Sequence, residues 1–319
     1  MKIFAIPDLN KVTGQSEISR IVKKTIKPEG VIYLNRGVIY FFFRLFKYFN
    51  TNPDYLYITL SRSKLGSFRD YLIIFFLKPK KILSHIHGFG FINNYFFLNR
   101  NLLKSTVIIL LTEESKKIFR ETHLKYNGEL MVIENPILED SNINETHISN
   151  IENLNVCYFS NLLKEKGINE FITLSEIYRD KYNFNIAGRN IDNISIPENV
   201  NYSGVLKGKA KNNFIIDNHI LVFYSYYKEE FYPVALIEFI YHGKMCIVKK
   251  HNSLEKTFKN LNIYWVDTYE DIIKLLSDKT SLINRLYDHN LWYNKNIDLV
   301  KERFSRLNFD NKIKQIFEK

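Results

Sequence analysis

Short apolar runs alternate with segments of helical period along almost the whole chain, and this alternation constrains the fold more than any other feature of the sequence. Strands that alternate with helices usually form a parallel sheet covered by helices on both faces. We therefore expect an α/β fold. The apolar runs that predict strands are KIFAI (2–6), VIYL (31–34), YLYIT (55–59), KILSHI (81–86), TVIILL (106–111), LMVI (130–133), NVCYFS (155–160), NFNIA (183–187), NVNYSG (199–204), HILVFY (219–224), MCIVKK (245–250) and IYWV (263–266).

The alternation is interrupted by the polar stretch EDSNINETHISNIEN (139–153), which predicts a linker between domains. A chain of 319 residues is long enough for two domains of about 150 residues each. We place an N-terminal domain at 1–145 and a C-terminal domain at 146–295. Each is expected to be a doubly wound parallel sheet, with a cleft between the two domains and ligands outside the carboxyl ends of the strands.

The formal charge of +11 is unevenly distributed along the chain. Residues 1–110 contain 17 Lys or Arg and 5 Asp or Glu, whereas residues 111–319 contain 28 and 29. A basic half implies a polyanionic partner, which can be nucleic acid, an anionic membrane surface or a phosphorylated substrate. An ordinary solvated surface is the alternative interpretation.

The cysteines and the apolar segments indicate where the protein works. Cys157 and Cys246 each lie in a short apolar run, which is typical of a reduced protein and not of a disulfide scaffold. The N-terminal MKIFAI is too short for a signal peptide. The apolar stretch 71–77 is far below the roughly 20 residues that span a bilayer. We expect a cytoplasmic protein that does not cross a membrane.

The stretch KEEFYPVALIEFIYHG (228–243) carries Glu230 and, eight positions later, Glu238 inside an apolar helix. Pro233 suits the first turn of that helix, because its missing N–H would be unpaired there in any residue. The free backbone N–H groups of the first turn and the helix dipole together favour an anion such as a diphosphate. A solvent-exposed Glu on an amphipathic helix would give the same pattern at Glu238.

This stretch resembles the E-x7-E signature of retaining GT-B glycosyltransferases (glycosyltransferase family 4, the "group 1" enzymes). The signature alone has little specificity, but several ordered motifs resemble the family as well. In the second half these are YFSNLLKEKGINEF (158–171), FNIAGRN (184–190), NYSGVLKGKAKNNFI (201–215) and the C-terminal ERFSRLNFDNKIKQIFEK; in the first half they are KVTGQSE (11–17), HIHGFGF (85–91), LLTEESKKIF (110–119) and VIENPI (132–137).

The resemblance implies a GT-B fold of two Rossmann-like domains. The first domain would bind the acceptor, the second would bind a nucleotide-sugar donor, and helices at 296–319 would pack back towards the first. The implied reaction moves a sugar to a saccharide, such as a lipid-linked or cell-surface glycan precursor, with retention of anomeric configuration. An oxocarbenium-like state and front-side attack are expected. The nucleotide base, donor sugar, acceptor, linkage and oligomeric state stay open.

The resemblance also assigns roles to individual residues. Glu238 would accept hydrogen bonds from the ribose hydroxyls, Glu230 would contact the donor sugar, and Lys166 would counter the diphosphate as a point charge. Asn161 stands where the family often has Arg, and Arg189 is a candidate to compensate. The implied catalytic residues are His87, Glu230 and Lys166, and the implied donor-binding residues are Gly14, Ser160, Asn161, Lys166, Gly188, Arg189, Gly204, Glu230, Phe231, Tyr232, Pro233, Val234, Ala235 and Glu238.

HIHGFGF allows other interpretations. His85 and His87 alternate on a strand and face one way, so a metal pair is conceivable, but no Cys or carboxylate cluster completes it. A dinucleotide fingerprint is excluded, because Asn93 occupies the third glycine position and no acid lies between residues 71 and 112. By resemblance His87 would face the reacting sugar carbon and the acceptor; a core or capping histidine is the alternative.

The chain contains no D-x-D sequence, with which glycosyltransferases of the other major fold hold a divalent metal. We therefore expect a metal-independent reaction and no cofactor beyond the donor.

The aromatic segments VIYFFFRLFKYF (38–49) and YLIIFFLKPKK (71–81) can be read in two ways. As helices they could lie at a membrane interface, with Arg44 and Lys47 reaching lipid headgroups, or they could be buried core helices. The rival function is a basic binding protein for nucleic acid or an anionic membrane surface. No nucleic-acid reading element is evident, so we expect no nucleic-acid partner. A degenerate transferase that binds donor without turnover is a third possibility.

Overall fold

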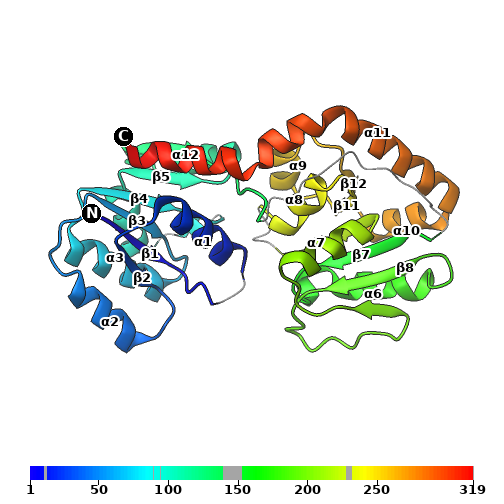
Figure 1. Cartoon of the computed structure of the whole chain (residues 1–319), viewed down its shortest axis with the longest axis horizontal. Coiled ribbons are helices and arrows are strands. Elements are labelled where there is room, and N and C mark those ends of the chain that lie inside the picture. The colour runs from blue at the N-terminus through cyan, green and yellow to red at the C-terminus, as the bar shows by residue number, and fades with distance from the viewer. Residues whose placement is uncertain (11–12, 89, 94, 139–152, 228–231, 319) are drawn as a thin grey trace. The chain divides into compact units, whose positions relative to one another are not determined.

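The computed structural model describes residues 1–10, 13–88, 90–93, 95–138, 153–227 and 232–318 (Figure 1). The chain divides into two compact units. The first contains Met1–Leu138 and Arg306–Lys319, and the second contains Glu139–Ser305. The stretch proposed as a linker falls largely outside the described residues. Helix α11 (Lys279–Phe304) is continuous, so the second boundary lies at its end and not at residue 295.

The first unit is a six-stranded parallel sheet in the order β2-β1-β3-β4-β5-β6. Its strands are β1 (Lys2–Ile6), β2 (Gly30–Tyr33), β3 (Tyr55–Thr59), β4 (Lys81–His85), β5 (Val107–Leu110) and β6 (Glu129–Val132). Its helices are α1 (Gly14–Ile26), α2 (Val38–Lys47), α3 (Lys64–Leu77), the 3-10 helix η1 (Gly90–Ile92), α4 (Phe96–Lys104), α5 (Glu113–Thr122) and α12 (Arg306–Glu318).

Two apolar clusters hold the helices of the first unit against its sheet. One contains side chains of α2, α3, α4 and α5, and the other contains side chains of α1 and α12. The C-terminal helix α12 thus belongs to the first unit, with Ile313 fully buried and the Asp310 carboxylate 2.6 Å from the Thr25 hydroxyl of α1. Helices on both faces of a parallel sheet are the arrangement that the alternating sequence predicted.

The second unit is also a six-stranded parallel sheet, in the order β12-β11-β10-β7-β8-β9. Its strands are β7 (Asn155–Phe159), β8 (Asn183–Ala187), β9 (Val200–Tyr202), β10 (Ile220–Phe223), β11 (Met245–Lys249) and β12 (Tyr264–Val266). Its helices are η2 (Lys164–Lys166), α6 (Ile168–Ile177), α7 (Gly208–Asp217), α8 (Val234–Tyr241), α9 (Asn252–Thr257), α10 (Tyr269–Ser277) and α11.

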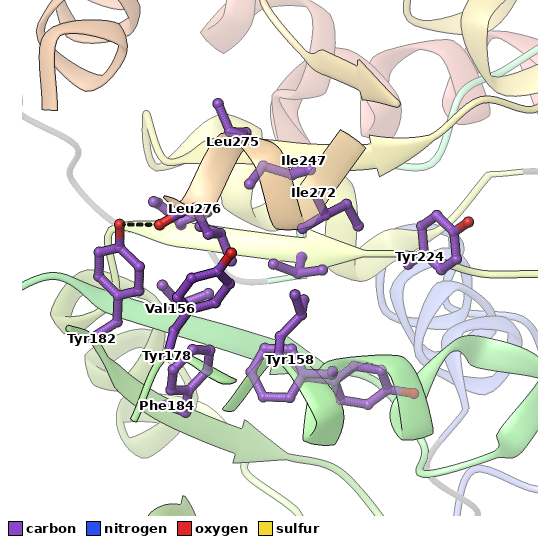
Figure 2. Close-up of a cluster of buried hydrophobic side chains, with 14 of the residues drawn as sticks. Val156, Tyr158, Tyr178, Tyr182, Phe184, Tyr224, Ile247, Ile272, Leu275 and Leu276 are labelled. Carbon is purple, nitrogen blue, oxygen red and sulfur yellow. Dashed lines mark hydrogen bonds between the residues drawn. The ribbon is translucent and has the colours of Figure 1, made fainter. Parts of the chain in front are cut away.

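An apolar cluster between this sheet and helices α6, α10 and α11 forms one core of the second unit. Figure 2 shows it, with Tyr178 and Tyr182 packed among aliphatic side chains. A buried tyrosine needs a partner for its hydroxyl, and both find one in α10: Tyr178 donates to the Ile273 carbonyl at 2.6 Å and Tyr182 to the Leu276 carbonyl at 2.7 Å. These bonds fix α10 against the chain that leads into β8.

Both units are doubly wound α/β layers, so the predicted fold class is confirmed. Among the described residues, no helix combines the length and the apolar character that crossing a bilayer requires.

Candidate functional site

The strand order of the second unit reverses between β7 and β10, which lie side by side at the centre of the sheet. The chain moves outwards from β7 through β8 to β9, and then outwards in the other direction from β10. In open parallel sheets, ligands bind outside the carboxyl ends of the strands at such a switch point. The loops that follow Phe159 and Phe223 are therefore the candidate site.

Two glycines allow the loops at this edge to pack backbone against backbone. Gly167 has φ +78°, and a Cβ built on it would lie 2.0 Å from the carbonyl oxygen of Tyr224. Gly188 has φ +148°, and its Cβ would lie 1.7 Å from the carbonyl oxygen of Ser160. Real Cβ atoms cannot approach so closely, and L side chains avoid these φ values. The two glycines thus hold the ends of β7, β8 and β10 together at the switch point.

Backbone hydrogen bonds reinforce this arrangement. Leu162 N donates to the Arg189 carbonyl at 2.8 Å, and Tyr226 N donates to the Glu165 carbonyl at 2.7 Å. The structure therefore brings together the predicted residues Ser160, Gly188 and Arg189. The side chains of Asn161 and Arg189 are exposed at this edge, and Gly204 accepts a hydrogen bond from Gly188 N through its carbonyl at 2.8 Å.

Cations and tyrosines face one another beside these loops. Lys166, at the end of η2, places its Nζ 5.5 Å from the Tyr227 ring centroid. Lys249, at the end of β11, places its Nζ 4.7 Å from the Tyr224 ring and 5.0 Å from the Tyr226 ring. The sequence interpretation named Lys166 but missed Lys249. The sequence feature that could have identified Lys249 is its place as the last residue of a buried apolar run. A side chain at the carboxyl end of a parallel strand faces the edge of the sheet where ligands bind.

Glu238 is not on a solvent-exposed face, so the exposed alternative raised for this residue is wrong. It is 4% exposed, and its Oε1 lies 2.5 Å from the Nζ of Lys211, which is 6% exposed. Lys211 was also missed. Its signal was helical spacing, because Lys211, Phe214 and Ile215 share the buried face of α7 and the first of them is a lysine.

The buried pair explains how an apolar helix keeps a carboxylate. An isolated buried carboxylate would take up a proton, whereas an adjacent ammonium favours its charged form. The surrounding wall is aromatic: Phe159 of β7 packs against Phe214 and Phe239 at centroid distances of 5.6 and 5.8 Å. Glu238 therefore has a partner from α7 within the chain itself, and does not depend on a ligand for one.

Other residues predicted around α8 are placed as follows. Glu230 and Phe231 lie outside the described residues. Tyr232 is buried, with its ring 5.4 Å from that of Phe258. Pro233, expected in the first turn, is instead the residue immediately before it, and Val234 and Ala235 begin the helix with partly exposed side chains. Their N–H groups point out of the first turn, where the helix has no internal acceptors.

In the first unit, Gly14 is the first residue of α1, which is capped by Thr13 and Ser16. His85 and His87 do face one way: their rings stack with centroids 4.0 Å apart. His85 Nδ1 lies 2.6 Å from the hydroxyl of Tyr57. The Nε2 atoms of both histidines are buried and have no hydrogen-bond partner among the described residues.

Burial lowers the pKa of His87 to about 3, with a further contribution from Arg62. Burial likewise lowers the pKa of His85 well below its usual value. His87 is therefore a neutral imidazole near neutral pH, which can accept or donate one hydrogen bond but carries no charge. Within the described part of the chain, no three His, Cys, Asp or Glu residues gather as a metal site.

The sequence model of the family "Glycosyl transferases group 1" matches residues 141–289. The matched segment is just under half of the chain and is similar in sequence to that family. It contains the switch point, both close-packed glycines and the Lys211–Glu238 pair. No curated protein matches the chain in sequence.

Solved structures show a likeness in fold that extends beyond the matched segment to the whole chain. Anabaena HepE, solved in complex with UDP-glucose, aligns with a TM-score of 0.71 at 13% identity over 99% of both chains. The sucrose-phosphate synthase of Thermosynechococcus elongatus aligns with a TM-score of 0.73 at 12% identity, over 100% of this chain and 98% of that one. The pneumococcal O-GlcNAc transferase GtfA, in complex with UDP and GlcNAc, aligns with a TM-score of 0.63 at 16% identity, over 84% of this chain and 57% of that one. The protein thus has the two-domain GT-B fold.

Proposed function

We propose that this protein is a glycosyltransferase that moves a sugar from a nucleotide-sugar donor to a saccharide acceptor, with retention of anomeric configuration and without a metal. The observation that carries the proposal is the switch point of the segment that matches the group 1 family. There, loops that pack closely through Gly167 and Gly188 lie beside Lys166, and the same unit buries the Glu238 carboxylate with Lys211. The structural neighbours HepE and GtfA support a uridine diphosphate sugar as the donor to test first.

In this proposal the donor's diphosphate lies at the N-terminus of α8. The N–H groups of Val234 and Ala235 and the positive end of the helix dipole would stabilise the charge on the departing diphosphate. Lys166 would add a full positive charge beside the η2 loop. Helix amides and a lysine together perform the electrostatic work for which other transferases recruit a divalent ion, so activity should survive chelation by EDTA.

Glu238 would bind the ribose through its hydroxyl groups. A charged carboxylate forms hydrogen bonds with hydroxyl donors that are roughly twice as strong as neutral ones. Lys211 would keep that carboxylate ionised and fix its rotamer, which removes the entropy cost of ordering it when the donor arrives. Glu230, outside the described residues, remains the candidate for contact with the donor sugar.

For the first unit we propose acceptor binding, with a glycan or a lipid-linked sugar as the acceptor. The neutral state of His87 limits what it can do there. It would orient an acceptor hydroxyl by a hydrogen bond to its Nε2, which has no partner among the described residues, and would not act as a cation beside the sugar ring.

The test is a thermal-shift screen with UDP-glucose, UDP-N-acetylglucosamine, GDP-mannose and the free nucleotides, followed by donor-hydrolysis kinetics. Binding at 100 times Kd should stabilise the protein by about 2.7 kcal/mol, which raises the Tm of the second unit by several degrees. We expect Lys166→Ala to lower kcat/KM by about 10²- to 10³-fold, as loss of one charge-stabilising group does.

Lys164→Ala is the matched control, because Lys164 lies in the same 3-10 helix with an exposed side chain. Equal losses in the two variants would contradict the role of Lys166. If no nucleotide or nucleotide sugar stabilises the protein, the proposed function is wrong and a basic binding protein becomes the better interpretation.

A further inference from the structure

Helix α2 has apolar side chains on two opposite sides, and only one of these sides packs against the core of the first unit. Phe41 and Leu45 point into the apolar cluster of the first unit and are 7% and 3% exposed. Ile39, Phe43 and Phe46, at helical spacing on the other side, are 88%, 67% and 72% exposed. Single exposed apolar residues are ordinary, but a whole exposed helix face is not.

The exposed aromatic surface continues from α2 onto α3 and α4. Phe49, just after α2, has its ring 5.6 Å from that of Phe76 in α3. Phe76 contacts Phe75 at 5.3 Å, and Phe75 contacts Tyr71 at 6.1 Å. Tyr71 in turn contacts Phe97 of α4 at 5.2 Å. Figure 1 shows α2 and α3 next to each other in the first unit.

We call this surface the aromatic face, and define it by Ile39, Phe43, Phe46 and Phe49 together with Phe75 and Phe96. The last two are 51% and 65% exposed.

The segment of the chain that carries the aromatic face is rich in basic residues and poor in acidic ones. Residues 36–104 contain 11 Lys or Arg and only two acids, Asp54 and Asp70. Asp70 is fully buried beside Arg69, and Asp54 is paired with Lys80 and the N-terminal amine.

One cation lies over a ring of the aromatic face, because Arg100 is 5.1 Å from the Phe96 ring. Two more lie beside neighbouring rings, Lys104 at 5.1 Å from Tyr71 and Lys47 at 5.6 Å from the buried Tyr48. These charges are therefore carried by α2 and α4, two of the three helices that present the apolar side chains.

We propose that the aromatic face docks the first unit onto an anionic membrane surface, with α2 lying in the plane of the lipid headgroups. Exposed apolar side chains that insert shallowly, ringed by Lys and Arg, are what an anionic bilayer interface binds. Helix α2 has ten residues and is about 15 Å long, against a hydrocarbon core of about 30 Å, so it lies on the membrane and does not cross it.

The charge distribution favours this partner over two others. A second copy of the chain would bring two basic faces together, and like charges repel. Single-stranded nucleic acid stacks its bases on aromatic rings, but Val38 and Ile39, at 71% and 88% exposed, are aliphatic and offer no ring to stack on. Aliphatic and aromatic side chains together suit hydrocarbon.

The test is flotation with vesicles of phosphatidylcholine alone and of phosphatidylcholine mixed with phosphatidylglycerol. The wild-type protein should float with the anionic vesicles and much less with the neutral ones. The variant Ile39→Ser/Phe43→Ser/Phe46→Ser should reduce vesicle partitioning at least about tenfold, because it removes the inserted side chains. Arg100→Gln and Lys104→Gln should each reduce binding to anionic vesicles about fivefold.

The matched control is Leu124→Ser/Leu291→Ser/Leu307→Ser, which removes three equally exposed apolar side chains outside the aromatic face. All replaced residues are exposed, and near-ultraviolet circular dichroism should confirm that each variant is folded. Nucleotide-sugar hydrolysis in the absence of vesicles should be unchanged in the Ile39/Phe43/Phe46 variant, which separates this proposal from the proposed function.

Equal binding to neutral and anionic vesicles, equal loss in the control, or no flotation at all would overturn the proposal. So would concentration-dependent dimerisation that the serine variant abolishes without any vesicle binding, or a preference for single-stranded nucleic acid over vesicles.

Discussion

The two units share one construction, six parallel strands between helix layers, yet they differ in where their unusual features lie. The first unit carries them on an outer helix face, where aromatic rings and cations remain exposed. The second carries them elsewhere: glycines allow backbones to touch at the carboxyl edge of its sheet, and a charged pair is buried between α7 and α8. The family model matches the second unit only, whereas the structural likeness covers the whole chain.

On the two proposals made above, this difference reflects what each function requires of the amino-acid sequence. A site that holds a diphosphate and a ribose requires particular residue types at fixed backbone positions, and a sequence model can detect them. A surface that contacts a membrane requires only apolar and basic character over an area, which many sequences satisfy. The first unit can therefore keep its fold while its sequence is recognisable only by the alternation of apolar runs with segments of helical period.

Among the tests of this comparison, we expect the substitution Gly188→Ala to have the largest effect on stability. Its Cβ would overlap the Ser160 carbonyl, and φ +148° is unfavourable for alanine. We expect the free energy of unfolding of the second unit to fall by at least about 4 kcal/mol, which is exceptional for the addition of one methyl group. Differential scanning calorimetry should show a lowered transition for the second unit and an unchanged one for the first.

Gly208→Ala is the control for Gly188. It also has positive φ, +54°, but a Cβ there would meet nothing within 4 Å. Only the conformational cost of about 1 kcal/mol should remain. If both substitutions destabilise the protein equally, close packing at the switch point is not what requires the glycine.

The next effect concerns the buried pair. Lys211→Met removes the ammonium group and leaves the Glu238 carboxylate buried without it. We expect the free energy of unfolding to fall by about 3 kcal/mol. This value is at the lower end of the range for such changes, because the carboxyl group can take up a proton. The double variant Lys211→Met/Glu238→Leu should recover most of the stability, since two apolar residues can replace a buried pair.

The double variant should nevertheless lose donor binding, measured by calorimetric titration with UDP-glucose. A stable double variant that binds the donor as the wild type does would show that the pair serves the fold alone.

Much of the fold was predictable because it depends on periodicity. All twelve apolar runs coincide with strands to within a few residues. The surface of α2 was not predictable in this way. Periodicity shows that a helix has apolar sides but not which side the neighbouring elements cover, so VIYFFFRLFKYF was equally consistent with a buried helix and with an interfacial one.

The candidate site was predictable only in part, for the same reason. Family motifs named Lys166, Gly188 and Glu238, because these lie within recognisable sequence motifs. Lys211 and Glu238 are 27 positions apart, and their contact depends on how α7 and α8 pack, which no local pattern encodes. The direction in which a side chain leaves a helix can be inferred from sequence, but its partner across a layer cannot.

The smallest expected effect is a difference between the two units in how their stability changes with pH. Burial depresses the pKa of His87 in the folded state to about 3, against about 6.5 when unfolded. Below pH 6.5 the unfolded chain binds a proton that the folded chain does not, so the stabilisation is complete above that pH and declines as the pH falls towards 3. His87 is only partly exposed, so we expect the free energy of unfolding of the first unit to fall by about 1–2 kcal/mol between pH 7.5 and pH 5.

The variant His87→Gln should have a Tm in the first unit that falls less over this interval than that of the wild type. The second unit provides the internal comparison, because His289, whose pKa burial lowers to about 4, is intact in both proteins and its contribution should not change. If the acid sensitivity of the first unit is the same with and without the imidazole, folding does not lower the pKa of His87, and the burial on which its proposed place as a neutral hydrogen-bonding group depends is wrong.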